Sequence, residues 1–442
     1  MNQKACKIRL NQCGNLQRHV ENGDTRLRTL QFDNSPASLR LWDFLLTENE
    51  RLHEARANGK KIIGTMKDLG TIPIMAYAFE NTIAFYPDGA WWTPCIMENN
   101  EGLFKIADSL GINESFCPVR AMLGAFLNKE HFPIPDMLIC STGAVCDDFA
   151  AITQRLNNLG FKINWWEIPH RRKADDNEIS INLPGGFNAP LSQIEFIKRE
   201  LEYIKSLLET SIGQTLTDEK LTKGIAKANI VRQLLAELRH TVFTAEINPL
   251  PALEMLIAEM LAIHFCSDID ETIRILRELL KEAKHRASIN DGISTTDAAK
   301  IFWVNPVADL KTMNLLEDCG GRICGTDYLF THALDAIPTN IPPMDALAQI
   351  ALADPMVGSS LERANRICRD IKKFGSEALI ISRIPGASHC ATEGTIIAEI
   401  VKKRLGIPTL EIEIPSLSDS LRQPIKNRIE TLIEIVLQRR QK

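Results

Sequence analysis

The feature that most constrains the fold of this chain is a change, twice along its length, in the spacing of its apolar residues. Toward both ends, short apolar runs alternate with amphipathic helical stretches, whereas residues 190–286 form long charged helical segments with few glycines. Short apolar runs that end at Gly, Pro, Ser or Asn are typical of buried strands. Strands that alternate with helices predict parallel sheets joined by right-handed crossovers. We therefore predict an α/β protein with a helical segment between two sheet-containing regions.

The positions of these runs predict the domain organisation. Strands are expected at residues 61–65, 136–140, 161–166, 300–306, 321–326, 378–382 and 408–414, and helices between them at residues 147–159, 361–374 and 395–405. We predict two Rossmann- or flavodoxin-like parallel-sheet domains with a helical insert between them. The predicted divisions are an N-terminal helical segment (1–59), a first α/β domain (60–185), a helical domain (186–292) and a second α/β domain (293–442).

The composition argues against several classes of protein. The formal net charge is -5, with 51 Lys and Arg against 56 Asp and Glu mixed along the chain, which argues against a nucleic-acid-binding protein. The sequence has no run of about 18 apolar residues and does not open like a signal peptide, so we expect no membrane association. A cytoplasmic location, where thiols stay reduced, is the expectation that follows.

Several of the eleven cysteines lie where a predicted strand ends or a helix begins. Cys140 and Cys146 follow the strand at 136–140, Cys390 follows the strand at 378–382, and Cys117 precedes a helical stretch. Ligands of open parallel sheets bind beyond the carboxyl ends of the strands. A thiol at a helix N-terminus has a lowered pKa, and the thiolate is the form that binds metals. These cysteines would converge if the two domains face each other.

The spacing of the cysteines bears on the kind of metal site. The chain has no Cys-x2-Cys pair, which argues against a structural zinc site. Iron-sulfur clusters accept dispersed ligands when a site is assembled at a domain interface. On the residues alone, Cys117, Cys146 and Cys390 fit cluster ligands and buried core thiols about equally well. Four further cysteines are expected to be small buried hydrophobic residues: Cys6, Cys13, Cys266 and Cys368.

An ordered set of motifs favours the cluster. The set comprises Cys117-Pro118-Val119-Arg120 with Gly124, Pro135 to Ile139 leading to Cys146-Asp147, Arg363 to Ile371, the strand at Ala378, His389-Cys390, Gly406-Ile407-Pro408, and Gln423 to Glu434 with Arg428 and Glu430. In order and spacing these motifs resemble subunits of the 2-hydroxyacyl-CoA dehydratase and benzoyl-CoA reductase family, of the 2-hydroxyglutaryl-CoA dehydratase D-component type. The resemblance covers most of residues 60–170 and 295–440.

The resemblance implies an enzyme subunit that holds one 4Fe-4S cluster through Cys117, Cys146 and Cys390. One iron would stay open to the thioester of an acyl-CoA, to which the cluster would deliver low-potential electrons. The implied reaction is that of an anaerobic acyl-CoA dehydratase, a lyase, or of an acyl-CoA reductase, an oxidoreductase. The implied partners are a homologous second subunit in a heterodimer and an ATP-dependent activator iron-sulfur protein. ATP is expected only on that activator, because this chain has no phosphate-binding loop motif.

The other cysteines leave alternatives open. Cys140 lies six residues before Cys146, and either could be the middle ligand, although the Cys146-Asp147 pair favours Cys146. Cys95, Cys140, Cys319 and Cys324 form a reserve that would suit the related double-cubane proteins, reductases of small molecules with an 8Fe cluster. One difference argues against that alternative. The double-cubane proteins carry a Lys-rich segment after the Cys-Asp pair, whereas residues 148–151 of this chain contain no lysine. A non-catalytic electron-transfer or scaffold subunit of the same fold is the remaining alternative.

Candidates for acid-base catalysis are weaker. His389 adjoins Cys390 and could donate a hydrogen bond to a cluster sulfur or to the substrate, although a structural histidine fits this position better. Glu393 is a second candidate, and it could equally cap its helix. His170 and its neighbouring arginines are candidates for the phosphates of CoA, but residues 171–173 are expected to form a solvated surface loop. The sequence predicts neither the acyl group nor the choice between dehydration and reduction.

Overall fold

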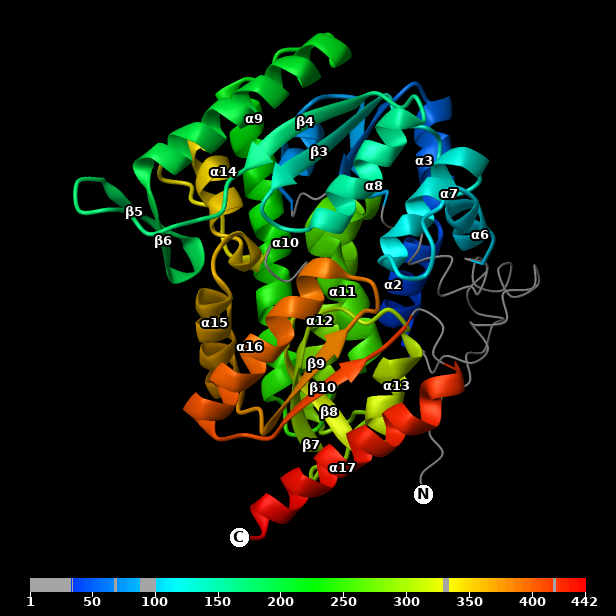
Figure 1. Cartoon of the computed structure of the whole chain (residues 1–442), viewed down its shortest axis with the longest axis vertical. Coiled ribbons are helices and arrows are strands. Elements are labelled where there is room, and N and C mark those ends of the chain that lie inside the picture. The colour runs from blue at the N-terminus through cyan, green and yellow to red at the C-terminus, as the bar shows by residue number, and fades with distance from the viewer. Residues whose placement is uncertain (1–32, 34, 67–69, 88–100, 329–333, 416–418) are drawn as a thin grey trace.

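The computed structural model describes residues 33, 35–66, 70–87, 101–328, 334–415 and 419–442, without the side chains of residues 101, 264 and 388–392. Two four-stranded sheets lie at opposite ends of the molecule, and long helices run beside both of them (Figure 1). Every neighbouring pair of strands in these two sheets is parallel. The predicted fold class, two parallel-sheet domains with a helical insert, is confirmed.

The first sheet has the strand order β2-β1-β3-β4. Its strands are β1 (Lys61–Met66), β2 (Thr82–Phe85), β3 (Met137–Gly143) and β4 (Ile163–Ile168). The helices of this half are α2 (Pro36–Leu46), α3 (Glu48–Ala57), α4 (Ile72–Tyr77), α6 (Glu101–Ser109), η3 (Pro118–Arg120), α7 (Ala121–Asn128) and α8 (Asp147–Asn158). Strand β3 continues three residues beyond its predicted end at residue 140, because Ser141 to Gly143 pair with β4. Polar residues in a parallel strand carry no apolar signal, so the sequence pattern ends too early here.

The helical insert follows a small antiparallel hairpin. The hairpin strands are β5 (Ser180–Leu183) and β6 (Phe187–Pro190), joined by η4 (Pro184–Gly186). The insert consists of α9 (Leu191–Ile212), α10 (Asp218–Thr244), α11 (Ala252–His264), η5 (Phe265–Ser267) and α12 (Ile269–Ser288). Helix α10 buries Leu221, Ile225 and Ala228 at helical spacing, and it contacts α4 of the first domain as well as β8, α14 and α15 of the second. The insert therefore packs against both sheet-containing domains, and these contacts do not define where one domain ends and the next begins. The domain boundaries predicted at residues 60, 186 and 293 stay a prediction.

The second sheet has the strand order β10-β9-β7-β8. Its strands are β7 (Ala299–Val304), β8 (Gly321–Asp327), β9 (Ala378–Arg383) and β10 (Thr409–Glu413). The helices of this half are α13 (Lys311–Asp318), α14 (Pro343–Leu352), η7 (Pro355–Val357), α15 (Ser360–Phe374), α16 (Ser388–Leu405), η8 (Asp419–Leu421) and α17 (Arg422–Arg440). Strand β8 is buried at every position, as expected for a parallel strand with both faces covered.

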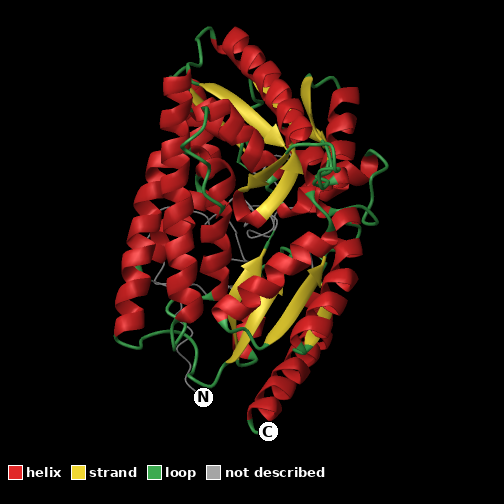
Figure 2. Ribbon diagram, turned by 90° about the vertical axis from the view of Figure 1, so that its left-hand side faces the viewer, coloured by secondary structure: helices red, strands yellow, loops and turns green. Residues whose placement is uncertain are grey.

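Helix α16 begins earlier than the sequence predicts. The apolar periodicity starts at Thr395, but the helix starts at Ser388, so that His389 and Cys390 belong to its first turn and not to the preceding loop. Residues 388–394 have no apolar stripe, and the sequence therefore has no helical signal there. The strands of the second sheet point toward the first domain (Figure 2), so the loops at their carboxyl ends face the other half of the molecule.

Candidate functional site

The elements that carry Cys117, Cys146 and Cys390 meet between the two domains. Cys117 is the N-cap residue of η3, Cys146 is the N-cap residue of α8, and Cys390 lies in the first turn of α16. Helix α8 contacts both η3 and α16. Three helices that each carry a predicted ligand at or near the N-terminus thus pack together, although their cysteines are far apart in the sequence.

A backbone contact at Gly386 fixes the approach of the two domains. Gly386 has φ +76°, and a Cβ atom at this position would lie 2.5 Å from the carbonyl carbon of Phe116. Only glycine adopts this conformation easily and leaves room for such an approach. Phe116 immediately precedes Cys117, and Gly386 lies in the turn that enters α16. The loops next to Cys117 and Cys390 are therefore in direct contact.

The described thiols differ in their surroundings. Cys117 is partly exposed, whereas Cys146 is buried with its Sγ 3.9 Å from Oδ2 of Asp148. The side chains of His389 and Cys390 lie outside the described residues. Within the part of the chain that the structure describes, no group of three or more His, Cys, Asp or Glu side chains is arranged to hold a metal ion. Because that part does not include the thiol of Cys390, the three-thiol set stays a prediction.

Cys140, the alternative middle ligand, lies inside β3 and not at its end. It pairs with Met66 and Trp165 of the neighbouring strands and has no exposed surface. Its Sγ lies 3.3 Å from Oγ1 of Thr153 in α8. The expectation that Cys140 follows a strand is wrong, since β3 runs on to Gly143, and of the two thiols only Cys146 lies at the carboxyl edge of the sheet.

Of the remaining reserve cysteines, Cys319 and Cys324 do not lie at the carboxyl edge of the second sheet. Cys319 ends α13 just before β8 begins, at the opposite edge of the second sheet from Cys390, and Cys324 lies within β8. Burial raises the pKa of Cys319 to about 11, with a further contribution from Glu430, and burial also raises the pKa of Cys324. Such shifts favour the thiol over the thiolate that metals bind. Cys95 lies outside the described residues.

Arg120, of the Cys117-Pro118-Val119-Arg120 motif, holds η3 against α6. Its Nη1 donates hydrogen bonds to the carbonyl oxygens of Phe104 and Ile112 and lies 2.6 Å from Oδ1 of Asp108. The guanidinium also stacks over the Phe104 ring, 4.5 Å from its centroid. The side chain of Arg120 is buried, so these contacts fix the segment that follows Cys117.

A buried ionic cluster holds the first turns of α16. The guanidinium of Arg363, in α15, donates to Oδ1 of Asp327 at 2.7 Å, to Oδ1 of Asn305 at 2.9 Å and to Oε2 of Glu393 at 2.7 Å. The other oxygen of Glu393 accepts a hydrogen bond from the Ser360 hydroxyl at 2.9 Å. Glu393 lies one turn after Cys390 on α16. Its contacts favour a positioning role for Glu393 over the acid-base and capping roles considered from the sequence.

Asn305, Asp327 and Arg363 have no role that the sequence alone predicts. Asn305 directly follows β7, and Asp327 is the last residue of β8, so both stand at the carboxyl edge of the second sheet. A polar residue at the carboxyl end of a buried strand is a sequence signal for a functional site. This signal could have identified Asn305 and Asp327 from the sequence. The sequence does not show that Asn305, Asp327 and Arg363 lie close together, because only the fold brings them into contact.

The Arg171-Arg172-Lys173 run is not a solvated loop throughout. The Arg171 side chain is fully buried, donates to the carbonyl oxygens of Leu352 and Asp354, and stacks 4.1 Å from the centroid of the Phe187 ring. Arg172 is exposed and pairs with Glu178. Arg171 therefore ties the first domain to the second, and its guanidinium is occupied by contacts within the protein.

These observations define a class of protein: a parallel α/β protein with two four-stranded sheets, in which helices that begin near cysteines pack together between the two halves. The chain belongs to the family described as 2-hydroxyglutaryl-CoA dehydratase, D-component, which it matches over residues 75–436. This result confirms the resemblance inferred from the sequence motifs. No curated protein matches the chain.

Membership of this family makes the chain a subunit of the 2-hydroxyacyl-CoA dehydratase type of enzyme. It also implies a partnership with other components of such an enzyme, since the family is named for one component. Among the described residues, no helix is both long enough and apolar enough to span a membrane.

Proposed function

We propose that this chain is the iron-sulfur subunit of an acyl-CoA dehydratase or reductase, with a 4Fe-4S cluster held by Cys117, Cys146 and Cys390. The observation that carries the proposal is the meeting of η3, α8 and α16, whose N-terminal residues include these three cysteines. The contact between Gly386 and Phe116 supports it, because it joins the two loops next to Cys117 and Cys390.

The chemistry of the proposed donors fits a cluster. Unpaired backbone N–H groups and the helix dipole stabilise negative charge at a helix N-terminus, so they favour thiolate ligands there. Cys117 and Cys146 come from the first domain and Cys390 from the second, an arrangement that iron-sulfur clusters accept. By contrast, the raised pKa values of Cys319 and Cys324, and their places at the end of α13 and within β8, do not support an 8Fe cluster.

Each part of the chain would have a distinct role. When bound, a 4Fe-4S cluster with an open iron supplies a Lewis acid and a source of single electrons at the thioester of an acyl-CoA. Arg120 would hold the loop of Cys117, and the cluster of Arg363 with Glu393 would hold the turn of Cys390. The two domains would screen the site from water, which strengthens the electrostatic interactions within it.

The proposed partners follow from the family and from the sequence. A homologous second subunit would complete a heterodimer, and an ATP-dependent activator iron-sulfur protein would supply the low-potential electron. A cytoplasmic, anaerobic setting would keep the thiols and the cluster reduced.

The test is the iron content of the anaerobically purified and reconstituted chain. We expect about four irons per chain, and a loss of most of them in each of Cys117→Ser, Cys146→Ser and Cys390→Ser. Cys140→Ser and Cys319→Ser are matched controls that should keep the iron. A chain that takes up no iron would overturn the proposal, and about eight irons would favour the double-cubane alternative instead.

A second experiment separates the two reactions. The reconstituted chain, its homologous subunit and the activator with ATP would be incubated with a 2-hydroxyacyl-CoA and, separately, with an aromatic acyl-CoA. Loss of water from the first compound indicates a dehydratase, and reduction of the ring of the second indicates a reductase.

A further inference from the structure

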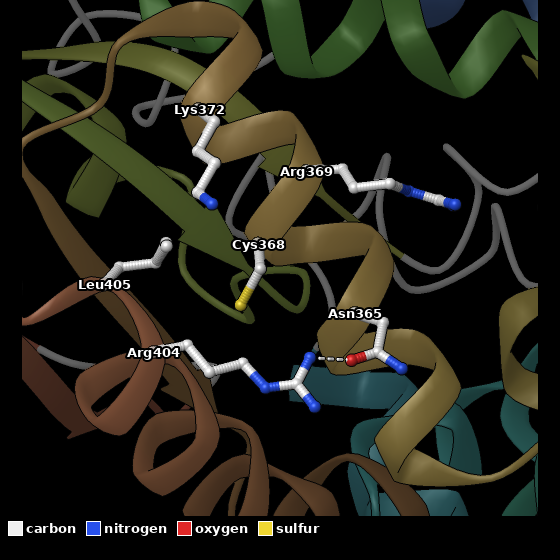
Figure 3. Close-up of a pocket in the computed structure, with 6 residues that line it drawn as sticks. All are labelled: Asn365, Cys368, Arg369, Lys372, Arg404 and Leu405. Atoms are coloured by element: carbon white, nitrogen blue, oxygen red, sulfur yellow. Dashed lines mark hydrogen bonds between the residues drawn. The ribbon is translucent and has the colours of Figure 1, made fainter.

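A pocket lies on the second domain, away from the candidate cluster site. It has a volume of about 370 Å³ and is open to solvent between α15 and the C-terminal end of α16. Its lining residues are Asn365, Cys368, Arg369, Lys372, Arg404 and Leu405. Figure 3 shows the side chains of Cys368, Lys372 and Arg404 directed from the two helices toward the same space, with Leu405 beside them.

The pocket is strongly basic. Three of its lining residues carry a positive charge, and no carboxylate lines it. Within the part of the chain that the structure describes, Arg369, Lys372 and Arg404 have no ion-pair partner. Arg404 donates to the side-chain oxygen of Asn365, and Arg369 donates to the carbonyl oxygen of Gly185 at 2.9 Å. Figure 3 shows Arg369 directed away from the space that Lys372 and Arg404 face. The two cations that face this space repel each other, and a bound anion would remove that repulsion.

The geometry of Arg404 suits a phosphate group. Its bond to Asn365 holds the guanidinium in place and leaves the other N–H groups for a ligand (Figure 3). A guanidinium presents two parallel donors that match two oxygens of a phosphate, and an ammonium such as that of Lys372 adds a point charge. Cys368 and Leu405 offer an apolar surface next to these donors. The volume lies at the lower end of the range for small-molecule sites.

Stabilisation of the helix does not account for this arrangement. Cations near a helix C-terminus interact favourably with the helix dipole, and the last turn of α16 contains Lys402 and Lys403 as well as Arg404. Neither lysine lines the pocket. Lys402 and Lys403 can thus interact with the dipole without facing α15, whereas Arg404 faces Lys372 and Cys368.

We propose that this pocket is an anion site that binds the phosphate groups of a nucleotide-like small molecule. Arg404 and Lys372 hold the phosphate. Along α16, Arg404 lies about 21 Å from Cys390, given a rise of about 1.5 Å per residue. The pocket is therefore distinct from the proposed cluster site, and its existence does not depend on the iron-sulfur function.

Two sources share this chemistry: the phosphates of coenzyme A and those of a free adenine nucleotide. The test is calorimetric titration of the full-length protein at low ionic strength with inorganic phosphate, CoA and ADP. We expect saturable binding of at least one probe with one site per chain. Arg404→Gln and Lys372→Gln should each weaken it about tenfold, because each removes a charge-assisted contact.

Lys403→Gln is the matched control, since it makes the same change of charge on the same turn of α16 outside the pocket. Its affinity should stay within about twofold of the wild type. Tighter binding of CoA assigns the pocket to that molecule, and tighter binding of ADP assigns it to a separate nucleotide; either result supports the site. No binding of any probe, or equal weakening by Lys403→Gln and Arg404→Gln, overturns it. Thermal unfolding of each variant verifies that it is folded.

Discussion

The guanidinium of Arg363 lies 2.7 Å from the carboxylate of Glu393 and 2.7 Å from that of Asp327, with no part of its side chain exposed. Burial alone would lower the pKa of Arg363, but the two carboxylates outweigh it and raise the pKa. Arg363 therefore stays charged and links three elements, α15, β8 and α16. The link reaches α16 one turn after Cys390.

Substitution Arg363→Met is expected to destabilise the protein by about 3–5 kcal/mol, because it leaves two buried carboxylates without their counterion. Urea unfolding at pH 7 measures this loss. Lys198→Met is the control, since Lys198 pairs with Asp345 at a partly exposed position and should cost about 0.2–1 kcal/mol. Similar losses in both variants would show that the Arg363 cluster does not stabilise the fold.

Gly386→Ala tests the contact between the two domains. The added Cβ would lie 2.5 Å from the Phe116 carbonyl carbon, so the domains have to move apart in addition to the strain of a positive φ. Gly406→Ala is the matched control, because Gly406 has φ +65° and a Cβ added there would have nothing within 4 Å. We expect about 1–2 kcal/mol of destabilisation in the control and more in Gly386→Ala. Iron uptake should fall only in Gly386→Ala; equal effects would argue against the contact.

Much of the fold could be predicted from the sequence because the strands are buried on both faces. Strands β1, β7 and β9 read as continuous apolar runs, and their predicted positions agree with the structure within a few residues. Strand β2 and the hairpin of β5 and β6 were not predicted, since each of these strands has four residues, too few for a clear pattern. The early start of α16 was not predicted either, because contacts of Glu393 with α15 hold a segment that has no apolar periodicity.

The candidate site was predictable only in part. Cys117 and Cys146 are predictable at helix starts, because Pro118 and Asp147 are typical first residues of helices. The prediction of Cys140 at a strand end was wrong, since the polar Ser141 and Thr142 continue β3. The ionic cluster around Arg363 was not predictable. Its members are separated by up to 88 positions in the sequence, from Asn305 to Glu393, and only the packing of α15 on the sheet brings them together.

The reactivity of Cys319 should be low for a cysteine that is only partly buried. Burial raises its pKa from 9.0 to about 11, so at pH 8 its thiolate fraction should be about one hundredth of that of an ordinary thiol. We expect alkylation by iodoacetamide to be slower by about that factor in the folded protein than in urea. Peptide mapping by mass spectrometry measures both rates at Cys319, and equal rates would contradict the shift.

Glu254 makes the stability of the protein depend on pH. This residue of α11 is fully buried; its Oε1 accepts hydrogen bonds from Nε1 of Trp42 at 3.0 Å and from the backbone N–H of Asp33 at 2.8 Å. Its Oε2 has no hydrogen-bond partner among the described residues. Burial raises the pKa of Glu254 to about 7, against the hydrogen bonds from Trp42 and Asp33, and the nearby Asp33 carboxylate adds to the increase. The Glu317 carboxyl, whose pKa burial also raises, is a further neighbour.

Between pH 4.5 and 7 the folded state keeps a proton on Glu254 that the unfolded state has lost. The stabilisation is therefore fully present below about pH 4.5 and is lost as the pH rises toward 7, by about 3 kcal/mol in total. Glu254→Gln keeps an acceptor for Trp42 and Asp33 and carries no charge. We expect it to unfold at nearly the wild-type urea concentration at pH 5 and at a higher one at pH 8. The exposed Glu54→Gln should change neither value, and parallel pH profiles for Glu254→Gln and the wild type would show that Glu254 does not carry this dependence.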